Sequence, residues 1–286
     1  MELLIIVMVI LFVTGLIYSH SRRLRRKAEE ENQSGELAMD KEAVTISSPL
    51  VYQGDDLDFS EELIRKVLIK HFPFYTKLLH PDQDKFTSRL KKFIRAKIFV
   101  IHDVKGYREM PILISASAIQ LTFGLNKFLM PHFSLIQIYP QEFIALEPMR
   151  VLIGNVSGNT INIAWKQFLE GYKNNSEKNN VGLHEMAHAL YFQNFETDEN
   201  IDRSFKDSYH HFTALGDKIF EREKILTIGL YSDYAMRNFQ EFWAESIEIF
   251  FQSPERLQNH YPDMYRLLCD LLCQDPLNYP NHYYPV

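Results

Sequence analysis

The first hydrophobic segment of the chain, Leu3–Tyr18, carries no charge. With its flanks it reaches about 17–19 residues, or ~26–28 Å of helix, just enough to cross the core of a bilayer. A core helix would show a polar stripe, and a cleavable signal peptide would have its basic residues before the run. Here the basic residues follow it, namely Arg22, Arg23, Arg25, Arg26 and Lys27. The pattern predicts one transmembrane anchor within residues 1–27, with the rest of the chain in the cytoplasm.

The next segment, residues 28–57, is polar and lacks apolar periodicity, which predicts a linker to a folded domain over residues 58–286. At the start of that domain, apolar residues recur at helical spacing over Phe59–Phe72. Asp58 or Ser60 is available to cap this helix.

Further along, helical spacing alternates with short β-rich runs. The predicted elements are an amphipathic helix over Asp84–Lys97, a strand over Ile98–Asp103, a buried helix over Pro111–Phe123 and a strand over Leu135–Phe143. Two β-rich runs around Gly158 predict a hairpin over residues 151–165. Beyond Asn180 the pattern is mostly helical. We therefore expect an α+β fold with a small sheet and a mostly helical half that carries the chemistry.

The composition is that of a globular protein, with 286 residues, 46% hydrophobic and 24% charged. The 31 Lys and Arg against 37 Asp and Glu give a net charge of −6, which argues against a general nucleic-acid binder. Two cysteines are too few for a disulfide-stapled secreted module.

The strongest chemical signal is the run His184-Glu185-Met186-Ala187-His188. Histidines four residues apart on a helix project from one face, about 6 Å apart, so both can bind one metal ion. The glutamate between them can then act as a general base toward a water on that ion. The flanking residues are apolar, and burying these polar groups without partners would be costly. The motif therefore predicts a Zn²⁺ site that needs one further protein ligand.

The third ligand is not supplied by a metzincin-type extension, because Tyr191 and Asn194 stand where that motif requires Gly and His. The better candidates lie in EFWAESIEIFF, where Glu241, Glu245 and Glu248 fall within roughly 60° of a helical wheel. Nearly every other face of this helix is apolar, which predicts a buried helix whose carboxylates need a cation. The alternative is a solvated acidic stripe on a half-exposed helix. Helical spacing alone does not choose among the three glutamates.

Together these segments resemble the zinc peptidases of the Mlc titration factor A family, which also resemble lethal-factor-type catalytic domains. The resemblance covers roughly residues 63–275 and includes the HEMAH run, EFWAESIEIFF, the following QSPE and the final LLCDLLCQDP. One departure is Met186, where the family usually has Phe. The resemblance implies that Glu241 is the third zinc ligand and that Tyr234 assists catalysis. It also implies aminopeptidase-like activity, and the founding member binds a sugar-responsive repressor.

Helix geometry adds expectations for the neighbouring residues. If the glutamate helix extends back by two turns, Tyr234 lies on the same stripe and its phenol can donate to a developing oxyanion. With Glu241 as ligand, Glu245 is expected to reach only the outer nitrogen of a liganding histidine, and Glu248 a more distant partner.

The strand Thr160–Ala164 and the following Trp165 precede the histidine helix, and the resemblance suggests that they border the cleft. An edge strand there would bind an extended peptide by main-chain pairing, with Trp165 as a substrate contact. The alternative is an ordinary core strand with a packed tryptophan.

Two functions remain open. The first is a membrane-anchored, cytoplasm-facing zinc peptidase that acts on a peptide or protein substrate and contacts lipid through its N-terminal helix. The second is a zinc-containing regulatory module that captures a transcription regulator without turnover. Glu185 favours the enzyme, because a pure binding module needs no general base.

Overall fold

The protein is described here by a computed structural model. It describes residues 49–102, 109–146, 149–173, 180–198, 200–226 and 228–279. The anchor predicted within residues 1–27 and most of the predicted linker lie outside these ranges. Within them, no helix is both long enough and apolar enough to cross a membrane.

The folded unit begins earlier than residue 58, where the sequence placed its start. Strand β1 (Leu50–Tyr52) and the 3₁₀ helix η1 (Gly54–Leu57) fall within the range predicted as linker. Leu57 is part of the hydrophobic core, and Leu50 and Tyr52 of β1 pack against it. A three-residue strand is too short to produce a visible hydrophobic period, which is why the pattern missed it.

A five-stranded mixed sheet has the order β1-β2-β3-β7-β6. Strands β2 (Ile98–Ile101), β3 (Leu135–Tyr139) and β7 (Thr160–Ala164) run parallel in its middle. Strands β1 and β6 (Gly154–Ser157) pair antiparallel at its two edges. β6 is therefore the edge strand on the side of β7.

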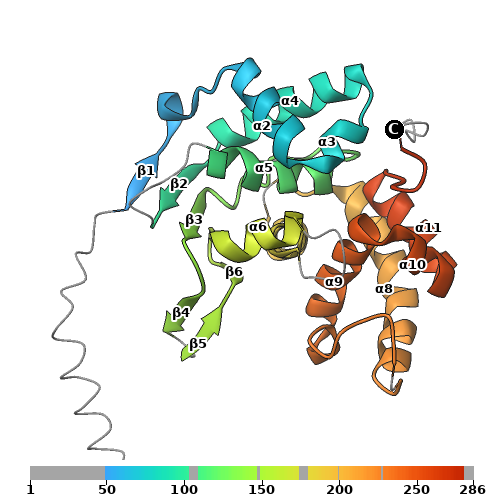
Figure 1. Ribbon diagram of the computed structural model, residues 1–286. Helices are drawn as coiled ribbons and strands as arrows, with labels where there is room; N and C mark the ends of the chain where they lie inside the picture. The colour runs from blue at the N-terminus through green and yellow to red at the C-terminus, as the bar shows by residue number, and fades with distance from the viewer. Residues whose placement is uncertain are drawn as a thin grey trace, which may run out of the picture. The chain divides into compact units, whose positions relative to one another are not determined.

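A second, two-stranded sheet consists of β4 (Phe143–Leu146) and β5 (Met149–Leu152), which project from the body of the molecule (Figure 1). The sequence predicted one hairpin over residues 151–165, but the beginning of that range belongs to β5. The predicted hairpin is β6–β7, which turns at Gly158 with φ +54°. The predicted strand Leu135–Phe143 is likewise divided between β3 and β4.

The helices of the first half cover the upper part of the molecule in Figure 1. They are α2 (Glu61–His71), α3 (Pro73–Lys77), α4 (His80–Arg95) and α5 (Glu109–Thr122). α2 begins after its cap Ser60, as expected. α4 begins before the predicted Asp84 because Pro81 is accommodated in its first turn. α5 joins β2 to β3 and is buried along nearly its whole length, as its uninterrupted apolar sequence predicted.

The second half is mostly helical. It contains α6 (Trp165–Lys173), α7 (Val181–Phe195), α8 (Arg203–Glu223), the 3₁₀ helix η2 (Ala235–Arg237), α9 (Phe239–Gln252), α10 (Pro254–His260) and α11 (Pro262–Leu272). α7 contacts β6, β7, α5 and α9, so it joins the sheet to the helices. The predicted α+β fold, with a small sheet and a helical half, is confirmed.

Candidate metal centre

Helix α7 carries the two histidines of the HEMAH run. It begins after Asn180, whose side chain accepts a hydrogen bond from the N–H of Leu183 at 3.0 Å and so caps the first turn. Most of its residues are buried, which matches their apolar character. His184 and His188 are partly exposed and line the same cavity.

Helix α9 brings a carboxylate to these histidines. Its cap Asn238 accepts hydrogen bonds from the N–H groups of Gln240 and Glu241, both at 3.0 Å. The indole of Trp243 donates to the carbonyl oxygen of Ala187 at 2.9 Å, which joins α9 to α7. Glu241 is thereby held in the first turn of α9, beside the histidines.

The side chains of His184, His188 and Glu241 converge. Nε2 of His184 lies 3.0 Å from Oε2 of Glu241 and 3.1 Å from Nε2 of His188. Nε2 of His188 lies 3.3 Å from the same carboxylate oxygen. In the part of the chain that the structure describes, these residues form a group whose ligand atoms all lie within 4.8 Å of one another.

This triangle fits a divalent metal ion. Ligand atoms bound at about 2.0–2.1 Å in tetrahedral geometry lie roughly 3.3–3.4 Å apart, close to the three separations. Two imidazole nitrogens and a carboxylate oxygen face one another, an arrangement that a cation satisfies and an apolar core does not. The donor set is that of catalytic zinc sites, and other first-row transition metals accept it as well.

The charges of the three side chains are strongly coupled without an ion. Burial alone would lower the pKa of His184, but its hydrogen bonds to Glu241 and Glu248 hold that pKa well above its usual value. Burial lowers the pKa of His188, and the hydrogen bond to Glu241 only partly opposes this. Burial would raise the pKa of Glu241, yet the hydrogen bonds to both histidines keep it far below its usual range. Glu241 is therefore ionised and available as a ligand.

The outer nitrogen of His184 is bound by Glu248, and not by Glu245 as helix geometry suggested. Oε1 of Glu248 lies 2.7 Å from Nδ1 of His184, and its Oε2 accepts the N–H of Asn180 at 2.5 Å. Glu245 instead accepts hydrogen bonds from the N–H and the hydroxyl of Ser232. Glu248 lies about 20° to one side of Glu241 around the helix and Glu245 about 40° to the other, and the packing of α9 against α7 brings the side of Glu248 to His184.

Glu185 is buried with one carboxylate oxygen unsatisfied. Its Oε2 has no hydrogen-bond partner among the described residues, and burial raises its pKa to about 8. The backbone of β6 passes directly beside it at Gly154, where a Cβ would lie only 2.4 Å from Oε1 of Glu185. The glycine thus permits the edge strand to approach the glutamate closely.

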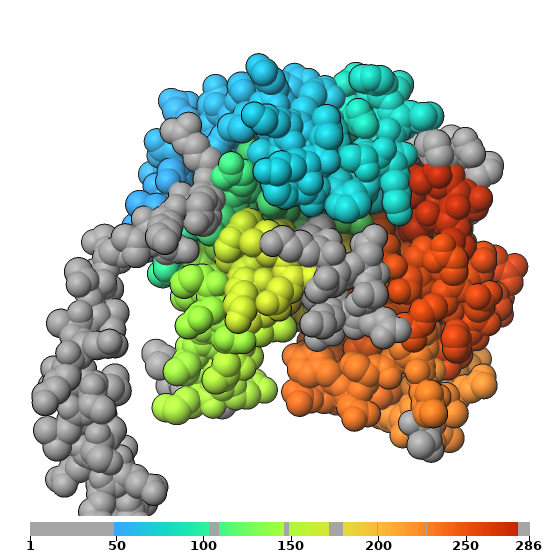
Figure 2. Space-filling view, in the orientation of Figure 1, coloured from blue at the N-terminus to red at the C-terminus, as the bar shows by residue number. Residues whose placement is uncertain are grey.

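These residues open into a cavity of about 290 Å³ between β4–β6 and the start of α9. Figure 2 shows the surface hollowed between the green hairpin segment and the orange segment that leads into α9. The lining residues are Ala145, Arg150, Leu152, Gly154, Asn155, Val156, His184, Glu185, His188, Phe192, Tyr234, Gln240 and Glu241. The wall formed by β4, β5 and β6 was not predicted. Its one sequence signal is Gly154 inside a β-rich run, which indicates a close backbone approach.

Tyr234 reaches the site by a different route from the one predicted. The glutamate helix does not extend back to it: Asn238 is extended (φ −163°, ψ 167°), and Tyr234 precedes η2. Its ring centroid nevertheless lies 6.1 Å from that of His184, and it lines the cavity. Burial and the charge of Glu241 raise the pKa of its phenol to about 12, so the phenol keeps its proton at neutral pH. Glu245 helps to position Tyr234, because it accepts a hydrogen bond from the N–H of Ser232, two residues before the tyrosine.

The structure places Trp165 away from the metal centre. Its ring stacks on Phe168 with a centroid separation of 5.3 Å, and it is not among the described residues that line the cavity. The strand before it, β7, lies inside the sheet between β3 and β6, so it is not an edge strand. The geometry thus corresponds to the packed-tryptophan alternative, and the edge beside the cavity is β6.

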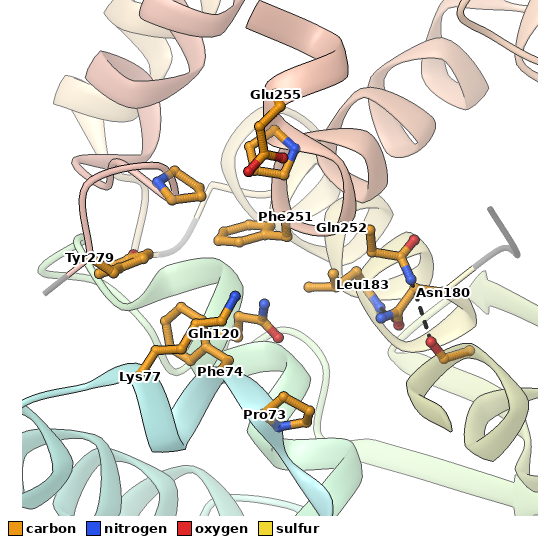
Figure 3. A pocket seen from close by; sticks show the side chains of 13 residues that line it. Pro73, Phe74, Lys77, Gln120, Asn180, Leu183, Phe251, Gln252, Glu255 and Tyr279 are labelled. Atoms are coloured by element: carbon orange, nitrogen blue, oxygen red, sulfur yellow. Dashed lines mark hydrogen bonds between the residues drawn. The ribbon is translucent and has the colours of Figure 1, made fainter. Parts of the chain in front are cut away.

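A second, smaller cavity of about 180 Å³ lies where the start of α7 meets the end of α9 (Figure 3). Asn180 and Leu183 face it from one side, Phe251 and Gln252 from another, and Lys77 of α3 from below in that view. The metal-binding candidates do not line it. The candidate metal ligands thus all face the cavity lined by His184, His188 and Glu241.

Two histidines one turn apart, the glutamate between them and a carboxylate from a second helix are the arrangement of the HExxH class of metallopeptidases. The chain belongs to the glucose-regulated metallo-peptidase M90 family, whose sequence pattern matches residues 52–272. It is 23% identical over 231 residues to an uncharacterized protein of Synechocystis sp., covering 74% of this chain and 83% of the relative. It is also 23% identical over 230 residues to the Mlc titration factor A of Yersinia pestis, covering 72% and 83%. The family resemblance read from the sequence is thus confirmed.

Proposed function

We propose that this protein is a zinc-dependent peptidase with aminopeptidase-like specificity, anchored to the membrane by residues 1–27. The observation that carries the peptidase proposal is the state of Glu185. This glutamate is buried in the same cavity as His184, His188 and Glu241, and one of its carboxylate oxygens has no protein partner among the described residues. A purely structural metal site has no use for an unpaired buried carboxylate, whereas a hydrolase requires a general base at this position.

A zinc ion held by His184, His188 and Glu241 would supply Lewis acidity to the scissile carbonyl and lower the pKa of a water in the site. Glu185 takes the proton of the attacking water and delivers it to the leaving nitrogen. Burial raises the pKa of Glu185, and the charge of a bound divalent cation would lower it again, so that the carboxylate can accept the proton. Tyr234 donates a hydrogen bond from its phenol to the oxyanion that forms on the carbonyl. Glu248 holds Nδ1 of His184, so that Nε2 points into the site.

The substrate is proposed to bind as an extended peptide along β6. This strand is the sheet edge beside the cavity, and Gly154, Asn155 and Val156 all line it. An edge strand has unpaired N–H and C=O groups at every second residue. An extended peptide can form hydrogen bonds with these groups. The sequence predicted this peptide-binding role for β7, the strand before Trp165; we assign it to the neighbouring strand β6 instead.

The anchor and the cytoplasmic location rest on the sequence. The uncharged run Leu3–Tyr18 is followed by the basic cluster Arg22–Lys27, which favours the cytoplasmic side for the domain by the positive-inside rule. The proposal is tested by C-terminal fusion of two reporters, one active only inside the cell and one only outside. Activity of the external reporter would contradict it.

A regulatory role is the second candidate. Relatives bear the name Mlc titration factor A, which points to interaction with a regulator protein. In that case the metal centre would stabilise a surface that captures a regulator, and turnover would not be needed.

The deciding experiment uses Glu185→Gln in the zinc-loaded full chain. Glutamine is nearly isosteric but cannot accept the proton, so we expect unchanged zinc content and a kcat lower by about 10²–10⁴-fold. Hydrolysis is measured on aminoacyl substrates and on N-terminally blocked peptides, with and without chelator. If the enzyme is an aminopeptidase, it should not cleave the blocked peptides. The control is Glu62→Gln on the exposed side of α2, which should behave as wild type. Wild-type rates in zinc-loaded Glu185→Gln would favour the regulatory module.

A further inference from the structure

The β4–β5 hairpin has two chemically distinct faces. In its register Ile144 is opposite Val151, and Ala145 is opposite Arg150. Because side chains alternate between the faces of a strand, these two pairs lie on opposite sides. Ala145 and Arg150 line the cavity of the metal centre, together with Leu152. The hairpin therefore presents an arginine toward the reacting groups.

Among the described residues that line this cavity, Arg150 is the single one with a lysine or arginine side chain. No carboxylate in the described part of the chain lies within ion-pair distance of its guanidinium, which also has no hydrogen-bond partner there. The carboxylates of the lining, Glu185 and Glu241, would together balance a bound divalent cation. Among the described residues of the lining, Arg150 is then the charge without a counter-charge, and an anion is the ligand that it favours.

The position of Arg150 along the chain limits how far this anion lies from the scissile bond. Gly154, which contacts the general base Glu185, is four residues away, a span of at most ~14 Å of chain. An extended peptide advances about 3.3 Å per residue. Because the arginine side chain lines the same cavity, its length of about 6 Å can close that span to about 8 Å, or two to three residues of an extended peptide.

We propose that Arg150 binds a carboxylate of the substrate, so that the preferred substrates are peptides with a negative charge within about three residues of the scissile bond. The planar guanidinium matches a carboxylate with two parallel hydrogen bonds. The carboxylate can be an Asp or Glu side chain, or the free C-terminus of a short peptide. This inference rests on the proposed peptidase function and names its substrate class.

The test compares matched peptides in the zinc-loaded full chain. One series carries Glu or Gln at the N-terminal residue or at one of the three residues after the scissile bond, and a second carries a free or amidated C-terminus. We expect the charged member of at least one pair to have a KM lower by about 10-fold, with similar kcat. A preference confined to the first series identifies a side-chain carboxylate, and one confined to the second identifies the C-terminus.

Variants at the same position make the inference specific to the guanidinium. Arg150→Gln should abolish the preference, Arg150→Lys should retain part of it, and Arg150→Glu should shift it toward peptides with Lys in place of Glu. The preference of the wild type should weaken with rising salt because the side chain is exposed. Arg266→Gln on α11, an exposed arginine outside the cavity lining, is the matched control and should keep the wild-type preference.

Binding of the same peptides to Glu185→Gln, measured by fluorescence anisotropy, separates this inference from the peptidase proposal. Tighter binding of the charged peptides that is lost in Glu185→Gln/Arg150→Gln supports it even if no peptide is cleaved. Equal binding of charged and neutral peptides, or a preference that survives Arg150→Gln, overturns it.

Discussion

The two walls of the metal cavity are built in opposite ways. On the helical wall, α7 and α9 are joined through buried groups: Trp243 donates to the backbone of α7, and Glu248 binds both a histidine and the start of that helix. On the other wall, the β4–β5 hairpin leaves Ile144 62% and Val151 69% exposed. The proposed metal ligands and general base thus lie on the buried wall, and the group proposed for substrate choice lies on the exposed one.

This difference follows from what each wall must do. Metal ligands and a general base must be held to within a fraction of an ångström, which requires packed neighbours and satisfied hydrogen bonds. A two-stranded sheet is only marginally stable alone, and few buried contacts leave it free to adjust to a ligand. Substitutions on the two walls should therefore separate catalysis and metal binding from specificity.

The largest effect is expected for Glu241→Ala on the helical wall. It removes the proposed third metal ligand, so zinc should be lost on dialysis against a weak chelator, and activity with it. Glu248→Ala, which removes only the partner of His184 Nδ1, should lower zinc affinity by about 10–100-fold. Glu245→Ala should leave zinc bound, because Glu245 contacts Ser232. Stoichiometric zinc in Glu241→Ala, with loss in either of the others, would refute the assignment.

A smaller effect is expected for Tyr234→Phe. The phenol is proposed to act only on the developing oxyanion, so its loss should lower kcat by about 10²–10³-fold while KM and zinc content stay close to wild type. Steady-state kinetics and metal analysis of the same preparation provide the check. A change in KM alone would assign Tyr234 to packing.

Gly154→Ala tests whether the two walls meet correctly at the general base. The new Cβ would lie 2.4 Å from Oε1 of Glu185, so either the carboxylate or β6 must move. A displacement of about 1 Å is expected to lower kcat by up to about 10²-fold. Zinc content should be unchanged, because the metal ligands are not displaced. Gly158→Ala at the β6–β7 turn meets no neighbour within 4 Å and serves as a control for backbone strain alone.

The smallest effects are expected from one methylene removed on each wall. Ile247→Val, in the fully buried part of α9, should lower the free energy of unfolding by about 0.5–1.5 kcal/mol. Ile144→Val on the hairpin should change it by less than about 0.5 kcal/mol. Urea unfolding of both variants measures the difference. Equal losses would mean that the hairpin is packed as firmly as the helices.

The positions of the two histidines could be predicted because they depend on local geometry. Four residues on a helix place two side chains on one face whatever the rest of the chain does, and His184 and His188 do line one cavity. The burial of α9 was equally visible, since its apolar residues surround the carboxylates. The α+β class could be predicted because segments with helical spacing of apolar residues alternate with short β-rich runs.

What the tertiary structure alone decided is how these elements meet. Whether Glu245 or Glu248 reaches the outer nitrogen of His184 depends on the crossing of α7 and α9, which helical spacing does not specify. Tyr234 comes to the cavity through a turn and η2, so its periodicity with Glu241 was coincidental. Arg150 and Gly154 reach it only because β5 and β6 fold back toward α7. These contacts join residues distant in the chain, and local hydrophobic patterns carry no information about them.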